Sequence, residues 1–147
     1  MTGEADLLAR EPAYRLDDQI GFVLRQVQQR HALIFAAAFG DDLTPMQWAV
    51  LAKLAEVGEC SQNQLGRLVS MDAATIKGVV DRLIRRGMTE TRADPDDRRR
   101  VVLKLTAAGC DTFEAGARRA ARVTDETLEP LTAREGEQLV ALLRRLR

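Results

Sequence analysis

Three consecutive arginines follow an acidic turn in the second half of this 147-residue chain. The turn and the basic run read Asp94-Pro95-Asp96-Asp97-Arg98-Arg99-Arg100. A guanidinium group is permanently charged and presents several donors in a fork that matches phosphate oxygens. A basic loop tip also suits a narrow DNA minor groove, whose negative potential attracts arginine. The segment therefore predicts a DNA-contacting loop; the alternative is a solvated turn in which aspartates and arginines pair with one another.

Two short amphipathic helices are predicted upstream of this loop, where they would hold it in place. Ser61 and Gln64 have the spacing of a capping box, which marks the start of the first helix. After a turn, we expect Asp72 to cap the second helix. The apolar residues of this second helix recur at helical spacing, at Ile76, Val79, Val80, Leu83 and Ile84.

The opposite face of the second helix is polar, basic and small in the middle. Because the DNA major groove admits a helix whose outward side chains reach base edges, we predict that this is a recognition helix. Gly78 in mid-helix is either a tolerated loss of stability or a point of close approach to DNA. The predicted DNA contacts, from both helices and the loop, are Ser61, Gln62, Ala74, Thr75, Lys77, Gly78, Arg82, Asp97, Arg98, Arg99 and Arg100.

The arginine loop is expected to join the two strands of a hairpin. Gly87 ends the second helix, and residues 88 to 92 then form the first strand. The returning strand directs Val101, Leu103 and Leu105 inward by alternation. Two helices followed by a hairpin wing predict a mainly α fold, a winged helix-turn-helix.

At these residues the chain resembles the MarR family of bacterial transcription regulators. The family's wing pattern is an aspartate, one residue, an arginine, five residues and then Leu-Thr, and here it reads Asp97, Arg99, Leu105 and Thr106. The strings DPDDRRRVVLKLTAAG and DRLIRRGM also look like that family. The resemblance implies that Asp97 orients Arg99 through an ion pair.

The resemblance further implies a homodimeric regulator, a repressor bound to a pseudo-palindromic operator in double-stranded DNA. In mid-helix many members carry Thr-Arg where this chain has Lys77-Gly78, so the operator bases do not follow from the resemblance. The net charge of zero conceals an asymmetry that fits DNA binding. Residues 1 to 57 carry five Lys or Arg against eight Asp or Glu, whereas residues 58 to 105 carry ten against seven.

Long helices are predicted on both sides of the winged helix. Apolar residues from Leu16 to Ala38 follow steps of three and four, so a helix of roughly 35 Å begins near residue 14 and needs a second subunit to cover it. Two further helices begin at Thr106 and Thr132. The first of them carries one apolar side, Cys110, Phe113, Ala117, Ala120, Thr124 and Leu128.

These patterns divide one domain, residues 1 to 147, into two functional parts. Residues 14–39 and 106–147 are predicted to form dimerisation helices, and residues 44–105 the DNA-binding lobe. Residues 1 to 13 are expected to form a loose tail. The alternatives are a monomeric helical bundle, or a winged helix that contacts protein instead of DNA.

The resemblance also implies a small aromatic acid or phenolic effector, bound where the dimerisation helices meet the DNA-binding lobe. In this chain Phe22 and Trp48 offer aromatic walls, and Arg25 and His31 offer cationic or switchable groups. These four residues are the predicted ligand site. The alternatives are that Trp48 belongs to the core and that His31 is a hydrogen-bonded structural residue.

Other chemistries are disfavoured by the composition. Cys60 and Cys110, the two cysteines, are expected to be buried thiols; the alternative is a peroxide sensor, because a helix start just after Cys60 would lower its pKa. One histidine and two distant cysteines offer no metal cluster, and no cofactor is expected. No nucleophile lies beside a base, so we expect no enzyme.

The location of the protein is predicted from the absence of targeting patterns. The N-terminus lacks a basic start followed by a long apolar run, which a signal peptide requires. The longest apolar stretch, residues 32 to 39, is too short to cross a bilayer. We therefore expect a cytoplasmic protein without membrane association.

Overall fold

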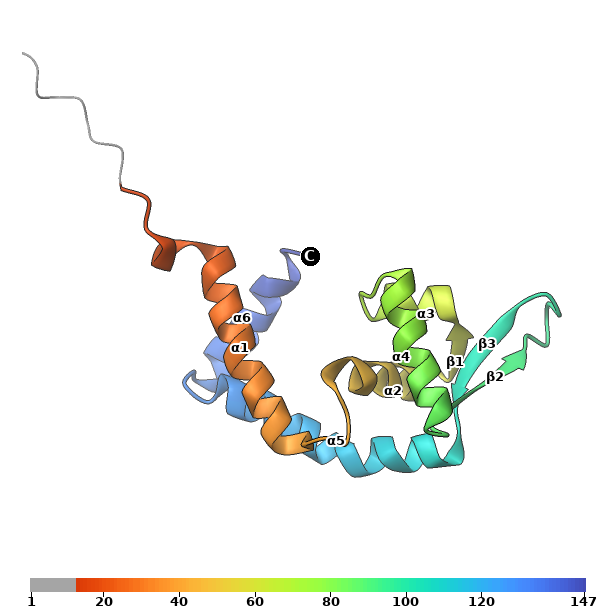
Figure 1. The fold of residues 1–147 in the computed structure, drawn as a ribbon. Helices are drawn as coiled ribbons and strands as arrows, with labels where there is room; N and C mark the ends of the chain where they lie inside the picture. Colours follow the sequence, from red (N-terminus) through yellow and green to blue (C-terminus); the bar gives the residue numbers. More distant parts are fainter. Residues whose placement is uncertain (1–12) are drawn as a thin grey trace, which may run out of the picture.

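The computed structural model describes residues 13–147 and consists mainly of helices with a small three-stranded antiparallel sheet (Figure 1). The predicted loose tail lies outside the described residues except for its last position. The helices are α1 (Ile20–Phe39), α2 (Pro45–Val57), α3 (Gln62–Leu68), α4 (Ala73–Arg85), α5 (Ala107–Leu128) and α6 (Ala133–Arg144), and the strands are β1 (Glu59–Ser61), β2 (Thr89–Ala93) and β3 (Val101–Leu105). The predicted order of helix, turn, helix and hairpin is confirmed.

Side-chain caps fix where the helices begin. Each of five helices has a hydroxyl or carboxylate that accepts a hydrogen bond from the backbone N–H three residues on, and the five caps are Thr44, Ser61, Asp72, Thr106 and Thr132. At Ser61 only this half of the predicted capping box forms, with Gln64 N–H donating to Ser61 Oγ at 3.2 Å. Ser61 is also the last residue of β1, so its backbone belongs to the sheet.

The N-terminal helix is shorter than predicted. Residues Leu16–Asp18 form a single 3₁₀ turn, and Gln19 is extended before α1 begins at Ile20. With 20 residues, α1 is about 30 Å long. Only its C-terminal end is buried, at Ile34, Phe35 and Phe39.

The sheet contains one more strand than predicted, in the order β1-β3-β2. β1 has only three residues, which is too short for a sequence pattern to reveal it. The predicted burial of β3 is wrong at its start, because Val101 is 55% exposed and Val102 is 8% exposed. Val102 is flanked in register by Ser61 and Arg92 on a central strand, whereas Val101 lies at the wing end of the sheet.

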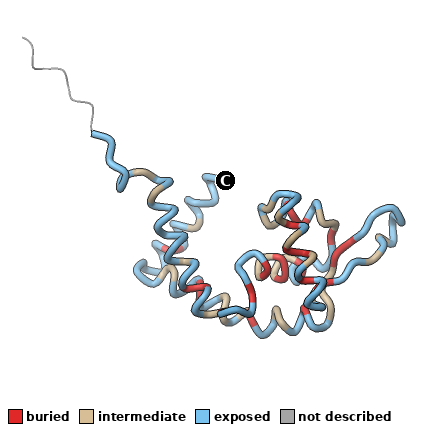
Figure 2. The backbone as a smooth tube through the Cα atoms, viewed as in Figure 1, coloured by how far each residue is buried: buried red, intermediate tan, exposed pale blue. Residues whose placement is uncertain are grey.

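The main core lies among α2, α3, α4 and β3. Its fully buried side chains include Val50, Leu51, Leu54, Leu65, Ile76, Val80, Leu83 and Leu103. Figure 2 shows this buried region on one side of the molecule, and shows that most of α1 and α6 on the other side is exposed. No helix among the described residues is long and apolar enough to cross a membrane.

α5 connects the two sides of the molecule, and its buried face differs from the prediction. The buried residues are Gly109, Gly116 and Val123, whereas Cys110 and Thr124 are exposed. A Cβ atom on Gly109 would lie 2.0 Å from the carbonyl oxygen of Met88, and one on Gly116 would lie 2.6 Å from the Trp48 ring. α5 therefore packs through its smallest residues, which an apolar pattern does not identify.

Candidate nucleic-acid interface

Helix α4 turns its apolar side inward and its predicted contact residues outward. Ile76, Val79, Val80 and Leu83 are buried. Ile84, which was predicted on the same apolar side, is instead exposed, because it lies at the C-terminal end of the helix. Ala74, Lys77 and Arg82 are exposed, and Thr75 and Gly78 are half-buried. The Asp72 cap accepts the Thr75 N–H at 2.7 Å, and this bond holds the pKa of the Asp72 carboxyl below its ordinary value.

Lys77 is engaged within α4. Its Nζ lies 2.8 Å from Asp81 Oδ2, one helical turn further on, and both side chains are solvent-accessible. Such a pair contributes little to stability because water screens it. It does mean that Lys77 would exchange one anionic partner for another when it binds a phosphate.

The wing loop presents its arginines while its aspartates hold the backbone. Asp94 Oδ1 accepts the Asp96 N–H at 2.9 Å, and Asp97 Oδ1 accepts the Arg99 N–H at 3.0 Å. The predicted ion pair between Asp97 and Arg99 is wrong for these two described residues, since the carboxylate binds the backbone of Arg99 instead. Asp97 therefore shapes the loop and leaves the Arg99 guanidinium free.

The three wing arginines, Arg98, Arg99 and Arg100, are all exposed. Among the described residues none of them forms an ion pair. This contradicts the alternative of a loop whose aspartates and arginines only pair with one another. The three aspartates of the loop give it a formal charge of zero, but three arginines without ion pairs at one hairpin tip are available to bind an anion.

The base of the wing is a different kind of surface, because its charges are paired. Arg92 on β2 donates two hydrogen bonds to the Glu59 carboxylate on β1, one of them from Nε at 2.8 Å, and this hydrogen bonding raises the pKa of Arg92. Lys104 and Glu90 pair at 3.3 Å on the same sheet. These pairs join all three strands and support the loop.

The start of α3 lies next to the wing. A polar cavity of about 390 Å³ is lined by Ser61, Gln62, Asn63, Arg67, Arg100 and Val101. It brings the predicted residues Ser61, Gln62 and Arg100 together and adds Asn63 and Arg67, which the sequence analysis missed. Asn63 and Arg67 were missed because the sequence pattern does not reveal β1. The pairing of β1 with β3 is what places α3 beside the wing.

The predicted ligand residues separate into two groups. His31 and Trp48 line one cavity of about 380 Å³, together with Phe35, Pro45, Ala120, Ala121, Val123 and Thr124. Phe22 and Arg25 do not line it. Both residues lie roughly 9 to 14 Å before His31 along the axis of α1. They are therefore far from the C-terminal end of α1, which is the end that α2 approaches.

Trp48 also belongs to the core that joins α1, α2 and α5. Its ring lies 5.3 Å from Phe39 and 5.4 Å from Phe113, centroid to centroid. Phe39 stacks on Phe35 at 4.4 Å, and Phe35 lines the same cavity as Trp48. Trp48 is thus both a core residue and a cavity wall.

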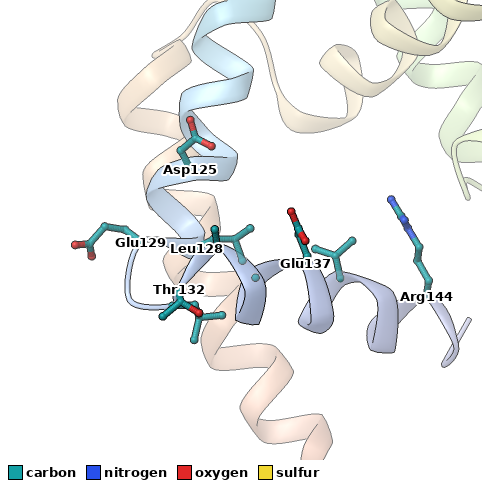
Figure 3. Close-up of a pocket in the computed structure, with 10 residues that line it drawn as sticks. Asp125, Leu128, Glu129, Thr132, Glu137 and Arg144 are labelled. Carbon is teal, nitrogen blue, oxygen red and sulfur yellow. The ribbon is translucent and has the colours of Figure 1, made fainter.

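A larger cavity of about 540 Å³ lies between the end of α5 and α6 (Figure 3). The side chains of Glu137 and Arg144 extend from the same side of α6. None of the four predicted ligand residues lines it. We do not assign the ligand site to it, because aromatic walls are absent among its described lining residues.

The two cysteines have opposite environments. Cys60 in β1 is buried opposite Leu103, and this burial raises the pKa of its thiol. The predicted buried thiol is confirmed for Cys60, and the alternative, a pKa lowered by the following helix, is wrong. Cys110 is exposed, contrary to the expectation of two buried thiols. Among the described residues no group of His, Cys, Asp or Glu has the arrangement of a metal site.

The winged helix and the whole chain both have known counterparts. The MarR family model matches residues 43–101, from the start of α2 to the wing. The transcriptional repressor NicR of Pseudomonas putida is 34% identical over 134 residues, which cover 90% of this chain and 85% of NicR.

Two solved structures share the fold over nearly the full length. A probable transcriptional regulator from Pseudomonas aeruginosa is 55% identical, with a TM-score of 0.87 over 90% of this chain and 100% of that one. BpsR of Bordetella bronchiseptica, whose DNA binding is regulated by 6-hydroxynicotinic acid, is 34% identical, with a TM-score of 0.88 over 92% and 97%. With its winged helix-turn-helix fold and relatives that extend along almost all of its length, the chain belongs to the MarR family of transcriptional regulators.

Proposed function

We propose that this regulator is a homodimeric, sequence-specific DNA-binding repressor. The observation that carries the proposal is the set of exposed wing arginines without ion pairs, beside an α4 face that is free of core contacts. Arginines at the wing fit phosphates or the minor groove, and α4 fits the major groove. The proposed contacts are Ser61, Gln62, Ala74, Thr75, Lys77, Gly78, Arg82, Asp97, Arg98, Arg99 and Arg100, with Asp97 acting by shaping the loop.

The exposed apolar side chains of the outer helices support the dimer. On α1 they are Ile20, Val23, Leu24 and Val27, and on α6 they are Leu139, Leu142 and Leu143. Exposed apolar surface of this kind on the outer helices is typical of a protein interface. A two-fold dimer would place one recognition helix on each half of a pseudo-palindromic operator, with half-site centres about 10 bp apart.

We propose that a small aromatic acid or phenol releases the operator by binding in the cavity of His31 and Trp48. The cavity has aromatic walls and few polar groups, which suits a flat ligand. Two relatives point the same way, since NicR is a repressor and the DNA binding of BpsR is regulated by 6-hydroxynicotinic acid. Phe22 and Arg25 are left out of this site because they lie away from the cavity.

A physical connection leads from this cavity to α4. Arg86, at the end of α4, donates to the carbonyl of Asp42 at 2.7 Å and to Gln47 Oε1 at 3.3 Å. Arg119 on α5 contacts Asp42 Oδ2 at 3.3 Å and lies over the Phe39 ring. A ligand that shifts Phe35 or Trp48 would disturb these contacts, and about 1.4 kcal/mol of coupling weakens DNA binding tenfold.

The proposed function is tested by operator binding with and without aromatic acids. We expect specific retardation of the DNA upstream of the regulated gene, loss of binding as salt rises, and release by an acid that also raises the melting temperature. Stabilisation without release would refute the repressor mechanism. Release by peroxide that depends on Cys60 would replace the ligand by a redox signal.

Asp81→Ala is expected to strengthen DNA binding. The change frees Lys77 and removes a negative charge from the α4 surface, so affinity for any duplex should rise about three- to tenfold at low salt, and the salt dependence should steepen by about one phosphate contact per protomer. Fluorescence anisotropy between 50 and 200 mM salt measures both quantities. Asp125→Ala on α5 is the matched control and should change neither; an unchanged affinity for Asp81→Ala would show that Lys77 does not contact DNA.

A further inference from the structure

The hydrogen bonds of His31 fix which of its nitrogens carries the proton. His31 Nδ1 lies 2.9 Å from Thr127 Oγ1, and the Thr127 hydroxyl donates to the Val123 carbonyl at 2.7 Å. A hydroxyl has only one hydrogen, so toward His31 the same oxygen acts as an acceptor. Nδ1 must therefore be the donor. In the neutral ring Nε2 is then left with a bare lone pair.

Arg30, the residue before His31, helps to hold this ring in position. Arg30 donates to the carbonyl of Thr127 at 2.7 Å and to that of Glu126 at 2.9 Å. These two bonds join the last turn of α5 to α1 beside His31. The imidazole is therefore oriented before any ligand arrives, and its tautomer is set by α5 rather than by the ligand.

Within residues 13–147, His31 is the one titratable side chain that lines the cavity. α1 also contributes Phe35, α2 contributes Pro45 and Trp48, and α5 contributes Ala120, Ala121, Val123 and Thr124. The charged groups on neighbouring turns do not line this cavity. Arg30 is bound to the carbonyls of Glu126 and Thr127, and a separate cavity is lined by Arg119, Arg122 and Glu126. A carboxylate that enters the cavity meets no permanent cation among these lining residues.

We propose that His31 takes up a proton at Nε2 when an aromatic carboxylate binds in this cavity, so that binding of the effector is linked to pH. The proposal rests on the ligand site described above. One proton moves from solvent to Nε2, and the imidazole becomes an imidazolium that donates a charge-assisted hydrogen bond to the carboxylate. A neutral ligand needs no proton, because its own O–H or N–H donates to the Nε2 lone pair.

This linkage determines how the regulator discriminates between ligands. Because each bound carboxylate brings one proton onto the ring, the affinity for a carboxylate falls about tenfold for each pH unit wherever the free ring is neutral. The affinity for a neutral donor is highest where the ring is neutral. Operator release by an aromatic acid is therefore more effective at lower pH.

The chain has a single histidine, so ¹⁵N-histidine labelling reports on His31 alone. The probes are 6-hydroxynicotinic acid and its amide, which differ in the carboxylate. At pH 8 we expect the free protein to show the tautomer protonated at Nδ1. The acid should protonate both nitrogens, and the amide should leave the ring neutral. Calorimetry in two buffers of different ionisation heat should show about one proton taken up per site for the acid and none for the amide.

Variants separate the role of the ring from that of its partner. His31→Gln should abolish proton uptake and the pH dependence of acid binding. Thr127→Val removes the acceptor and should shift the free ring toward the tautomer protonated at Nε2, whereas Thr127→Ser should retain the wild-type tautomer. Thermal melting of each variant shows whether it is folded.

Two results overturn the proposal. One is a free ring protonated at Nε2, and the other is binding of the acid without proton uptake. If neither probe produces binding heat or a thermal shift, the ligand site itself fails and the linkage fails with it. The tautomer of the free protein is read independently, so the two failures are distinguishable.

Discussion

The double variant Arg98→Ala, Arg99→Ala is expected to lose about a thousandfold in DNA affinity near 0.15 M salt, for specific and unrelated duplexes alike. A dimer would lose four positive charges, and each phosphate contact contributes about 0.9 to the slope of log affinity against log salt, so the slope should flatten by about 3.6. The reason lies in the loop, where Asp97 is bonded to the backbone and leaves both guanidinium groups free. Anisotropy titrations at several salt concentrations measure the slope.

The matched control removes two arginines that lie away from the wing. Arg118→Ala, Arg134→Ala deletes exposed residues of α5 and α6 with the same change in net charge. Its slope should equal that of the wild type. If the wing variant behaves like this control, the wing has no part in DNA binding, and α4 alone would have to carry the interaction.

Gly109→Ala is expected to destabilise the fold by about 3 kcal/mol, which lowers the melting temperature by roughly 10 °C. The new Cβ would lie 2.0 Å from the Met88 carbonyl oxygen, and that oxygen also accepts the Thr106 N–H at 3.1 Å. Because the obstacle is backbone, no side-chain rotation relieves it, and α5 must move away from the root of the wing. Thermal unfolding at one fixed protein concentration measures the effect.

Gly78→Ala is the matched control, since it places the same methyl group in a helix where nothing lies within 4 Å. There the change should stabilise α4 by about 1 kcal/mol. Equal melting temperatures for the two variants would mean that the contact between α5 and Met88 is not tight. The Gly78 variant also reports on DNA, because a loss of operator affinity despite a more stable helix would show that close approach at Gly78 matters.

The sequence predicted the parts of the fold that depend on local chemistry. Asp72, Thr106 and Thr132 begin helices where expected, because an N-cap needs only a short side chain and the N–H groups that follow it. The buried side of helix α4 was predicted for the same reason, because its apolar residues recur at helical spacing over consecutive turns. Gly87 ends it with a positive φ of 71°.

Features that depend on partners distant in the chain could not be predicted. β1 exists because Cys60 pairs with Leu103, more than 40 residues away, and no pattern within three residues records that pairing. The buried face of α5 is set by the approach of Met88 and Trp48, which favours glycines over the larger apolar residues.

The candidate sites show the same limit. His31 and Trp48 share a cavity because α1, α2 and α5 meet there. Phe22 lies about two and a half turns before His31 and therefore on the opposite side of α1, away from this cavity. The role of Asp97 was missed in detail, since the sequence cannot tell a carboxylate that pairs with a side chain from one that binds the backbone.

A hydroxyl-radical footprint of the wild-type protein on its operator, combined with the protein-to-DNA stoichiometry, tests the proposed function most directly. We predict two protomers per site and two protected segments related by two-fold symmetry, about 10 bp apart on one face of the duplex. Protection at the flanking minor grooves should disappear in Arg98→Ala, Arg99→Ala. A single asymmetric segment protected by one protomer, or no protection at any sequence, would contradict a dimeric operator-binding repressor.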